Sequence, residues 1–489
     1  MSRARLRLPL AAVLAGAALA ALPAGAFGAA TITIVNKNAA GEGFNDATPA
    51  TPVGGNPGTT VGQQRLNAFK YAAGVWGSLL DDSIEIKIDA SFDALDCTAT
   101  TGTLGSAGPN IVESDFPNAP VAGTWYAGAL ANRLAGQNLS PADSDIKAQF
   151  NSKLGQTGCL DGTSWYYGYD NNHGDNIDLV AVLLHEFAHG LGFLTFVDDS
   201  AKEFNGTPDI FERHIIDVEM GKHWDEMSDS ERLASQVHTG KLLWDGINVQ
   251  AGTRAILDPR PSLAVEFPAS IAQSYDIGQA SFGGDVTTSG VSGALVDAQG
   301  PALDGCAAIT NASEVAGKVA LVQRGNCNFT TKAVNAQNAG AIGLVVGDNV
   351  AASSPPAMGG DAPTVTIPVV SITQADYSTI HAHIDESIAV KIFANPRQLA
   401  GAGSEDRMKL YAPNPEEPGS SISHWDTSAH PNLLMEPNLS SDLPHTVDLT
   451  LPLLRDIGWA PNSGPAPGPR APAQEPPKRT DSPRTVERP

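Results

Sequence analysis

The feature that most constrains this chain is an apolar segment with a His-Glu-x-x-His motif in its second half. The segment NIDLVAVLLHEFAHG, residues 176–190, is apolar on nearly every side of a helix, which predicts that it lies buried in a core. Candidates for its ends are Asp175, Asn176 and Asp178 at the start and Gly190 and Gly192 after the motif. Whatever surrounds this helix must therefore accommodate two histidines and a glutamate in a buried position.

The spacing of the motif indicates a metal site. Residues four apart on a helix share a face, so His185 and His189 can present their imidazoles to one ion, with Glu186 beside it. A carboxylate there can take a proton from water and pass it to a leaving amine, which is the chemistry of peptide hydrolysis. A chance pattern would bury Glu186 at a free-energy cost, so we favour the metal. A catalytic zinc usually takes three protein ligands, which requires one more residue from elsewhere.

The first place to look for a third ligand is the segment directly after the helix. HEFAHGLGF resembles the zinc-protease pattern of the metzincins, in which a Gly after the second His turns the chain sharply and a further ligand follows three residues later. That position is Thr195, which makes a poor zinc ligand. The short form of the pattern would therefore need Asp198 or Asp199 instead.

A closer match lies more than 200 residues away, in SSISHWDTSAHPNLLMEP, residues 420–437. This stretch resembles the leishmanolysin-like branch of the metzincins, where an insertion separates the helix from a third His in a Ser-His-Trp-acid context, and a Met-containing turn lies under the metal. The resemblance implies that His424 is the third ligand and that Met435 packs below the zinc without binding it. Many metzincins keep a Tyr after that turn to stabilise the oxyanion, but no Tyr follows Met435, so the sequence identifies no such donor.

Other potential ligands are weaker candidates. His430 lies nearer to Met435 and competes with His424, and Glu212 would serve if the chain were a gluzincin with a glutamate ligand on a second helix. His173 is expected in a polar loop, and calcium in the Asp- and Asn-rich loop 170–178 is possible but unsupported. The remaining histidines are expected to be surface or structural residues: His214, His223, His238, His381, His383 and His445.

A second module is predicted between these two parts of the site. The stretch GKVALVQRGNCNFTTKAVNAQNAGAIGLVVGDN, residues 317–349, predicts a strand, a turn at Arg324 and Gly325, a helix and a second apolar strand. It resembles the protease-associated (PA) domain over about residues 280–395. The resemblance implies a non-catalytic lid or substrate-interaction module, with Cys306 and Cys327 bridging its sheet to a neighbouring loop. A spacer role is an equally good interpretation.

The expected fold class is α+β, with a metzincin-like zinc protease domain, built from a mixed sheet and the active-site helix, interrupted by a β-rich PA domain. Strand, helix and strand patterns at residues 31–38, 62–80 and 83–92 begin the first layer, and residues 447–459 are expected as its closing helix. Insertion at a surface loop costs little where the ends of the insert lie close together. The predicted organisation is a signal peptide at 1–30, catalytic segments at 31–255 and 401–460, the PA domain at 256–400, and a disordered Pro-rich tail at 461–489.

Charge and cysteine content narrow the location and the partners. Removal of the signal peptide takes away Arg3, Arg5 and Arg7 and leaves 27 basic against 53 acidic residues, a balance of −26 that would repel nucleic acid and anionic lipid. No later segment predicts a membrane span, so we expect a secreted protein without stable membrane insertion. Four cysteines then favour two disulfides. The pairing Cys97–Cys159 with Cys306–Cys327 is one of three, preferred because each pair stays within one apparent folding unit.

The sequence therefore predicts a secreted zinc metalloendopeptidase that acts on protein or peptide substrates. His185, His189 and His424 would hold the zinc, Glu186 would be the general base, and Met435 would support the site. One alternative is a secreted binding or adhesion protein with a structural metal site and a PA interaction domain. The intact Glu186 argues against it, because a structural zinc needs no base. Another alternative keeps the metal chemistry but hydrolyses a non-protein amide.

Overall fold

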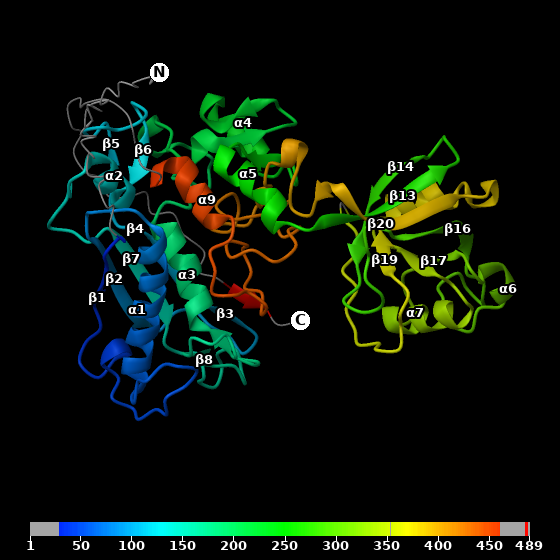
Figure 1. The fold of residues 1–489 in the computed structure, drawn as a ribbon, viewed down its shortest axis with the longest axis horizontal. Coiled ribbons are helices and arrows are strands. Elements are labelled where there is room, and N and C mark those ends of the chain that lie inside the picture. The colour runs from blue at the N-terminus through cyan, green and yellow to red at the C-terminus, as the bar shows by residue number, and fades with distance from the viewer. Residues whose placement is uncertain (1–28, 353, 460–484, 488–489) are drawn as a thin grey trace, which may run out of the picture.

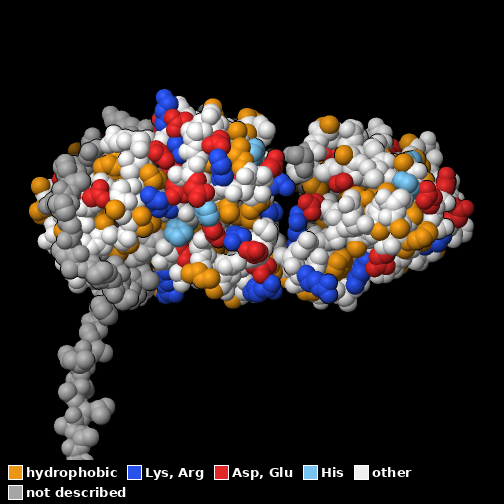
Figure 2. Space-filling view, turned by 90° about the horizontal axis from the view of Figure 1, so that it is seen from above, with side chains coloured by type: hydrophobic (Ala, Val, Ile, Leu, Met, Phe, Trp, Pro, Cys, Tyr) orange, Lys and Arg blue, Asp and Glu red, His pale blue; other side chains and the backbone are white. Residues whose placement is uncertain are grey.

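The computed structural model describes residues 29–352, 354–459 and 485–487, which form two lobes (Figure 1). The expected signal peptide lies outside the described residues except for its last two, Ala29 and Ala30. The expected tail also lies outside them, except for β21 (Thr485–Glu487), which pairs antiparallel with β3 (Thr101–Thr103). Figure 2 shows the lobes as two rounded bodies that meet at a narrow junction.

The first lobe is built on a four-stranded mixed sheet. Its strands, in spatial order, are β1 (Ile32–Asn36), β2 (Ile86–Asp93), β7 (Ile146–Asn151) and β4 (Gly105–Pro109). The first three run parallel, and β4 is an antiparallel edge strand. Along β2, buried residues alternate with partly exposed ones, as the alternating sequence predicts for a strand with one solvated face. The helices α1 (Val61–Leu79) and α3 (Leu179–Gly190) lie side by side against this sheet (Figure 1).

Helix α3 is the segment that carries the His-Glu-x-x-His motif, and all of its residues are buried. Of the three predicted caps, the structure uses Asp178, whose Oδ1 accepts hydrogen bonds from the backbone N–H groups of Val180 and Ala181 at 2.8 and 3.3 Å. Two indole N–H groups donate to backbone carbonyls in the middle and just beyond the end of the helix: Trp76 to Leu184, and Trp459 to Leu191. The helix is therefore fixed at its start and along its length.

The rest of the first lobe consists of short helices and strands outside the four-stranded sheet. The helices are α2 (Gly128–Ala135), α4 (Asp229–Ser235), α5 (Ile247–Ile256) and α9 (Thr450–Leu454). The strands are β5 (Val112–Ser114), β6 (Trp125–Ala127), β8 (Trp165–Tyr166), β9 (Ile177–Asp178), β10 (Ile215–Asp217), β11 (Lys222–His223) and β12 (Leu242–Trp244). The predicted closing helix is shorter than the sequence suggests, because α9 gives way to a wider helical turn over Arg455–Trp459.

The second lobe is an eight-stranded sheet with three helices. Its strands, in spatial order, are β14 (Gln273–Asp276), β13 (Pro259–Phe267), β20 (Ala389–Leu399), β16 (Val291–Asp297), β17 (Val319–Gln323), β18 (Gly343–Gly347), β19 (Val369–Ile372) and β15 (Gly278–Gln279). The helices are α6 (Ala312–Val315), α7 (Phe329–Asn338) and α8 (Gln374–His381). Strand β17 is buried on both faces, so its side chains alternate between two separate hydrophobic cores, as its continuous apolar run predicts.

The two ends of the second lobe lie next to each other. Pro259, at the start of β13, pairs with Leu399, at the end of β20, and the N–H of Ala400 donates to the carbonyl of Asp258 at 2.9 Å. The chain thus leaves the first lobe and returns to it through one antiparallel pair of strands. Such an arrangement allows a long insert without separating the segments on either side of it.

Each lobe contains one disulfide, in the pairing that the sequence analysis prefers. Cys97 is bonded to Cys159 in the first lobe, and Cys306 to Cys327 in the second. Disulfides fit a secreted or luminal protein, because they persist in oxidising compartments. Across the described residues, the search for a helix of sufficient length and apolarity to span a bilayer finds none.

Candidate metal centre

Three imidazoles from distant parts of the chain meet at the C-terminal half of α3. The Nε2 atom of His185 lies 3.1 Å from Nε2 of His189 and 3.3 Å from Nε2 of His424. Zinc–nitrogen bonds of about 2.0–2.1 Å at tetrahedral angles would place two ligand nitrogens about 3.3 Å apart. The spacing therefore suits a zinc ion, and Thr195, Asp198 and Asp199 are not part of the group.

The second ring nitrogen of each histidine is held by a backbone carbonyl. Nδ1 of His185 lies 2.7 Å from the carbonyl oxygen of Leu434. Nδ1 of His189 lies 2.8 Å from the carbonyl oxygen of Phe193, and Nδ1 of His424 lies 2.7 Å from that of Ser420. Because a carbonyl oxygen only accepts, each Nδ1 carries the proton, and each Nε2 turns a lone pair toward the other two rings. Metal-binding histidines are commonly oriented in this way. The donor set and its tautomers thus fit a divalent metal, although the role of the three residues as ligands stays a prediction.

The segment around Met435 lies directly against α3, as its position in the predicted site requires. The carbonyl of Leu434 accepts the proton of His185, while the N–H of Leu434 donates to Oδ2 of Asp448 at 2.6 Å. The backbone N–H of Trp425 donates to the carbonyl of Met435 at 2.8 Å, which joins this turn to the residue after His424. The side chain of Met435 is fully buried in the main core.

Asp448 is a part of this site that sequence analysis missed. Its carboxylate accepts from Leu434 and also from the N–H and hydroxyl of Thr450, and burial raises the pKa of this carboxyl group. It therefore connects the start of α9 to the carbonyl that orients His185. An acidic residue two positions before a Thr at the beginning of an apolar helical segment is a capping signal that could have indicated its local role, but not its distant partner.

Two glycines after the motif have separate functions. Gly190 is the last residue of α3, and a Cβ atom at this position would lie 2.5 Å from Ile146 in β7, so only glycine permits this close packing. The sharp turn comes two residues later, at Gly192, where φ is +115°. This turn brings the carbonyl of Phe193 back to His189.

Glu186, the predicted general base, directly follows His185 on α3 and is buried, with 3% of its surface exposed. Thr195 lies beyond the turn and donates its hydroxyl to Asp209 at 2.7 Å, so it belongs to the structure around the site. Asp198 accepts from the backbone N–H groups of Ser200 and Lys202 and stabilises its own loop.

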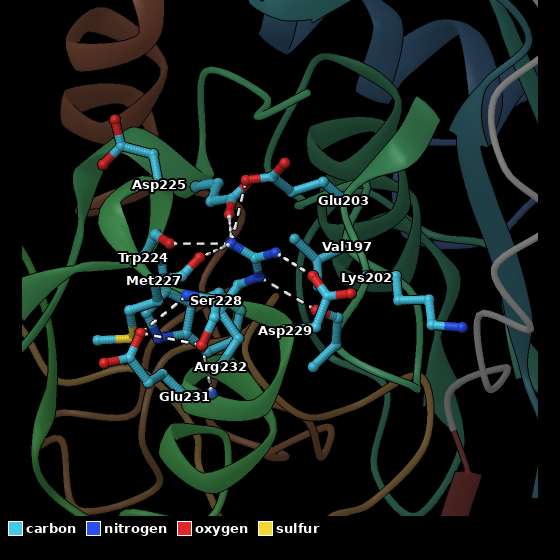
Figure 3. Close-up of polar contacts among 12 residues, drawn as sticks. Val197, Lys202, Glu203, Trp224, Asp225, Met227, Ser228, Asp229, Glu231 and Arg232 are labelled. Atoms are coloured by element: carbon cyan, nitrogen blue, oxygen red, sulfur yellow. Dashed lines mark hydrogen bonds and ion pairs between the residues drawn. The ribbon is translucent and has the colours of Figure 1, made fainter. Parts of the chain in front are cut away.

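The rival ligands lie elsewhere. His430 is exposed and its Nδ1 lies 2.8 Å from Asp258, at the junction of the lobes. Glu212 is fully buried, 3.4 Å from Nη1 of Arg232, and burial together with the Asp209 carboxylate raises its pKa to about 9. Figure 3 shows the contacts of Arg232, which reach Glu203 and Asp229 as well as the carbonyls of neighbouring loops. Glu212 therefore lies beside the buried Arg232 and outside the imidazole group.

Loop 170–178 contributes no residue to a metal group in the part of the chain that the structure describes. Asp170 accepts from the hydroxyl of Tyr166 and from the N–H of Asn172, and Asp178 caps α3. His173 lies in a loop, as predicted, with one ring nitrogen 3.0 Å from the carbonyl of Ser441. His445 is not a surface residue, because it lies 2.9 Å from Oδ2 of Asp178 in a buried pair.

Comparison with known proteins identifies the second lobe. The family model of the PA domain matches residues 291–380, which cover β16 through most of α8. The chain contains a PA domain. The match lies within the 280–395 interval that the sequence predicts, and it leaves the first lobe outside the matched residues.

Curated relatives match part of the chain. The ER degradation-enhancing alpha-mannosidase-like protein 3 of Homo sapiens is 34% identical over 149 residues, which are 29% of this chain and 16% of that protein. Receptor homology region, transmembrane domain- and RING domain-containing protein 1 of Arabidopsis thaliana is 39% identical over 97 residues, 19% of this chain and 31% of that protein. The chain thus spans less than a third of the length of either relative.

Solved structures resemble a limited portion of the chain. A zinc aminopeptidase from Bacillus subtilis is 21% identical, with a TM-score of 0.23 over 30% of this chain and 37% of that chain. An aminopeptidase from Aneurinibacillus sp. strain AM-1 is 18% identical, with a TM-score of 0.22 over 29% of this chain and 31% of that chain. Scores this low carry no argument about the first lobe or its reaction.

Proposed function

We propose that the protein is a secreted, zinc-dependent metalloendopeptidase with a metzincin-like first lobe and a PA domain as insert. The observation that carries this proposal is the convergence of three Nε2 atoms, from His185, His189 and His424, each with its Nδ1 proton directed to a backbone carbonyl. A structural zinc usually has four protein ligands, whereas three histidines leave one position for water or substrate. The arrangement therefore supports catalysis over a purely structural site.

The residues of α3 supply both ligands and a base. When bound, zinc would supply a Lewis acid that polarises the substrate carbonyl and lowers the pKa of water. Glu186 lies three residues before His189, and residues three apart share a face of a helix, so its carboxylate would lie on the metal side of α3. There it would accept a proton from the attacking water and return it to the departing amine. Asp448, Leu434 and Ser420 would keep the imidazoles in orientation through their hydrogen bonds.

A second candidate is a secreted binding protein in which the metal site is structural. It is favoured by the PA domain, which is the part of the chain that a family model matches. In this case Glu186 would have no role in hydrolysis, and its replacement would leave every function intact. The two candidates therefore differ in a single measurable property, the dependence of peptide cleavage on Glu186.

The test compares zinc content and casein cleavage of the purified protein with those of three variants. Glu186→Gln should keep its zinc and lose cleavage by at least about 100-fold, as expected for a general base. His424→Ala should lose both zinc and cleavage, because two histidines bind zinc far more weakly than three. His430→Ala is the matched control, because this exposed histidine pairs with Asp258 and lies outside the imidazole group.

Four results would contradict the proposal. A wild-type protein that binds no zinc would rule out the metal site. A protein that binds zinc but cleaves neither casein nor short peptides would favour the binding protein, and cleavage confined to small non-protein amides would change the substrate class. Loss of zinc in His430→Ala but not in His424→Ala would show that His430, and not His424, is the third ligand.

A further inference from the structure

The backbone next to His424 forms a short antiparallel ladder with a tyrosine-containing segment. Leu410 and Trp425 face each other across it, and the N–H of Asp426 donates to the carbonyl of Lys409 at 3.0 Å. One residue further along, the N–H of Tyr411 donates to the carbonyl of His424 at 2.9 Å. Tyr411 is therefore the cross-strand neighbour of the third predicted zinc ligand.

The ladder also determines the face on which this tyrosine lies. Side chains of directly opposite residues in an antiparallel pair share a face, and the next pair lies on the other face. Leu410 and Trp425 are both fully buried in the main core. Tyr411 and His424 consequently share the opposite face, where His424 turns its Nε2 toward His185 and His189. The Cβ atoms of such neighbours are about 5 Å apart, and a phenol extends further from its Cβ than an imidazole does.

The hydroxyl group of Tyr411 is placed where it can be redirected. The ring is half-buried, and its hydroxyl donates to Oε2 of Glu417 at 3.0 Å. Glu417 is exposed, and its backbone carbonyl accepts from the N–H groups of Ser420 and Ser421 in a tight turn. A hydrogen bond to an exposed carboxylate contributes little net free energy, so exchange of this acceptor for a substrate oxygen costs little.

We propose that Tyr411 donates a hydrogen bond to the substrate carbonyl oxygen as negative charge develops on it. The inference rests on the proposed function, and it supplies the donor that the sequence lacks after Met435. A donor aimed at the developing charge stabilises the transition state more than the bound substrate. Its removal should therefore lower kcat more than it raises KM.

The test measures kcat, KM and zinc affinity of Tyr411→Phe on a casein-derived fluorogenic peptide. We expect kcat to fall on the order of 100-fold, as for the loss of one oxyanion donor, with KM and zinc affinity within about twofold of the wild type. Tyr166→Phe is the matched control, because this tyrosine also donates to an acidic side chain, Asp170, and lies outside the imidazole group. Glu417→Ala separates direct donation from an indirect effect, and it should keep most of the activity, because the hydroxyl then remains free to reach the substrate.

The outcomes are distinct. Equal losses of kcat in Tyr411→Phe and Glu417→Ala, or a loss of zinc affinity in step with activity, would overturn the proposal and make Tyr411 a positioning residue for His424. Unchanged kcat in Tyr411→Phe, with wild-type protein that cleaves and Glu186→Gln that does not, would overturn this inference alone. A wild-type protein that cleaves no peptide would overturn the proposed function and the inference together.

Discussion

At the scale of residues, the candidate metal centre depends on backbone carbonyls as much as on side chains. Each of the three histidines uses Nδ1 to bind a carbonyl, and those carbonyls come from Phe193, Ser420 and Leu434. Side-chain substitution cannot remove a backbone carbonyl, so these contacts persist through most mutations of the residues that supply them. The residues that hold the carbonyls in place, such as Asp448, are more sensitive to change.

The buried Glu212 gives a prediction about pH. The side chain is fully buried, both of its carboxylate oxygens lack a hydrogen-bond partner, and its pKa is raised from 4.5 to about 9, chiefly by burial and then by Asp209. A raised carboxyl pKa means that the folded protein favours the protonated form. Its contribution to stability is thus complete below about pH 4.5 and is lost as the pH rises toward 9.

We therefore expect the melting temperature of Glu212→Gln to fall less than that of the wild type when the pH is raised from about 5 to 9. Gln keeps the volume of the side chain and cannot ionise, and the measurement is the melting temperature at several pH values with saturating zinc. Glu219→Gln, at an exposed position, should leave the wild-type pH profile unchanged. If Glu212→Gln instead lowers the melting temperature equally at every pH, then the carboxylate is ionised against Arg232 in the folded state.

At the scale of elements, α3 is the centre of the first lobe, and Asp178 is the residue that fixes its start. One oxygen of Asp178 caps the helix, and the other pairs with His445 at 2.9 Å, from the segment that follows the Met435 turn. Both partners are almost fully buried. This side chain thus joins the beginning of α3 to the segment of the chain that carries the rest of the candidate metal centre.

We expect Asp178→Ala to lower the free energy of unfolding by about 2–3 kcal/mol, since it removes a helix cap and leaves His445 without its buried partner. Asp178→Asn should cost less, because its amide oxygen still caps α3. Thr60→Ala, which removes the cap of α1 without breaking a second side-chain contact of this kind, should cost about 1 kcal/mol. Urea denaturation measures all three. A cost for Asp178→Ala no greater than that for Thr60→Ala would show that the His445 contact contributes nothing.

At the scale of the whole molecule, the second lobe interrupts the first and adds to its core only Leu399, the last residue of β20. The main core of the first lobe contains residues up to Leu257, before the insert, and resumes at Leu399. The two cores of the second lobe contain residues of that lobe alone. The paired ends Pro259 and Leu399 explain how the metal centre closes across the insert. We infer from this separation that each lobe holds its own fold.

Replacement of residues 260–398 by a short Gly-Ser turn should therefore leave the metal centre intact. We expect the shortened protein to bind one zinc per chain and to cleave short peptides at rates within a few-fold of the full-length protein, because neither the imidazole group nor its carbonyl partners lie in the insert. Zinc content and peptide cleavage measure this, and the same excision in Glu186→Gln gives the inactive control. Loss of zinc or unfolding of the shortened protein would show that the first lobe depends on the insert.

Local features of the fold follow from the sequence because they depend on neighbouring residues. The periodicity of residues 62–80 and 176–190 predicts α1 and α3 to within a few residues, and the repeated apolar runs around Arg324 predict β17 and β18. The sequence does not predict which cap α3 uses, the partners of His445, or the role of Asp448. His445 and Asp178 are 267 residues apart in the chain, and His185 and Leu434, the residue that Asp448 holds, are 249 apart, so no local pattern records these contacts. The cap of α3 is local, but three neighbouring residues could supply it, and their spacing does not choose among them.

By itself, the sequence determined the chemistry available to this protein: two histidines and a glutamate on a buried helix, and a PA domain marked by its own motif. Only the tertiary structure decided between His424 and His430 as the residue beside that helix, because both stand close to Met435 in the chain. The physical reason lies in three contacts between distant segments: the return of the chain at β20, the pairing of Leu410 with Trp425, and the contact of Leu434 with His185. Together they hold His424 beside the helix and leave His430 at the surface.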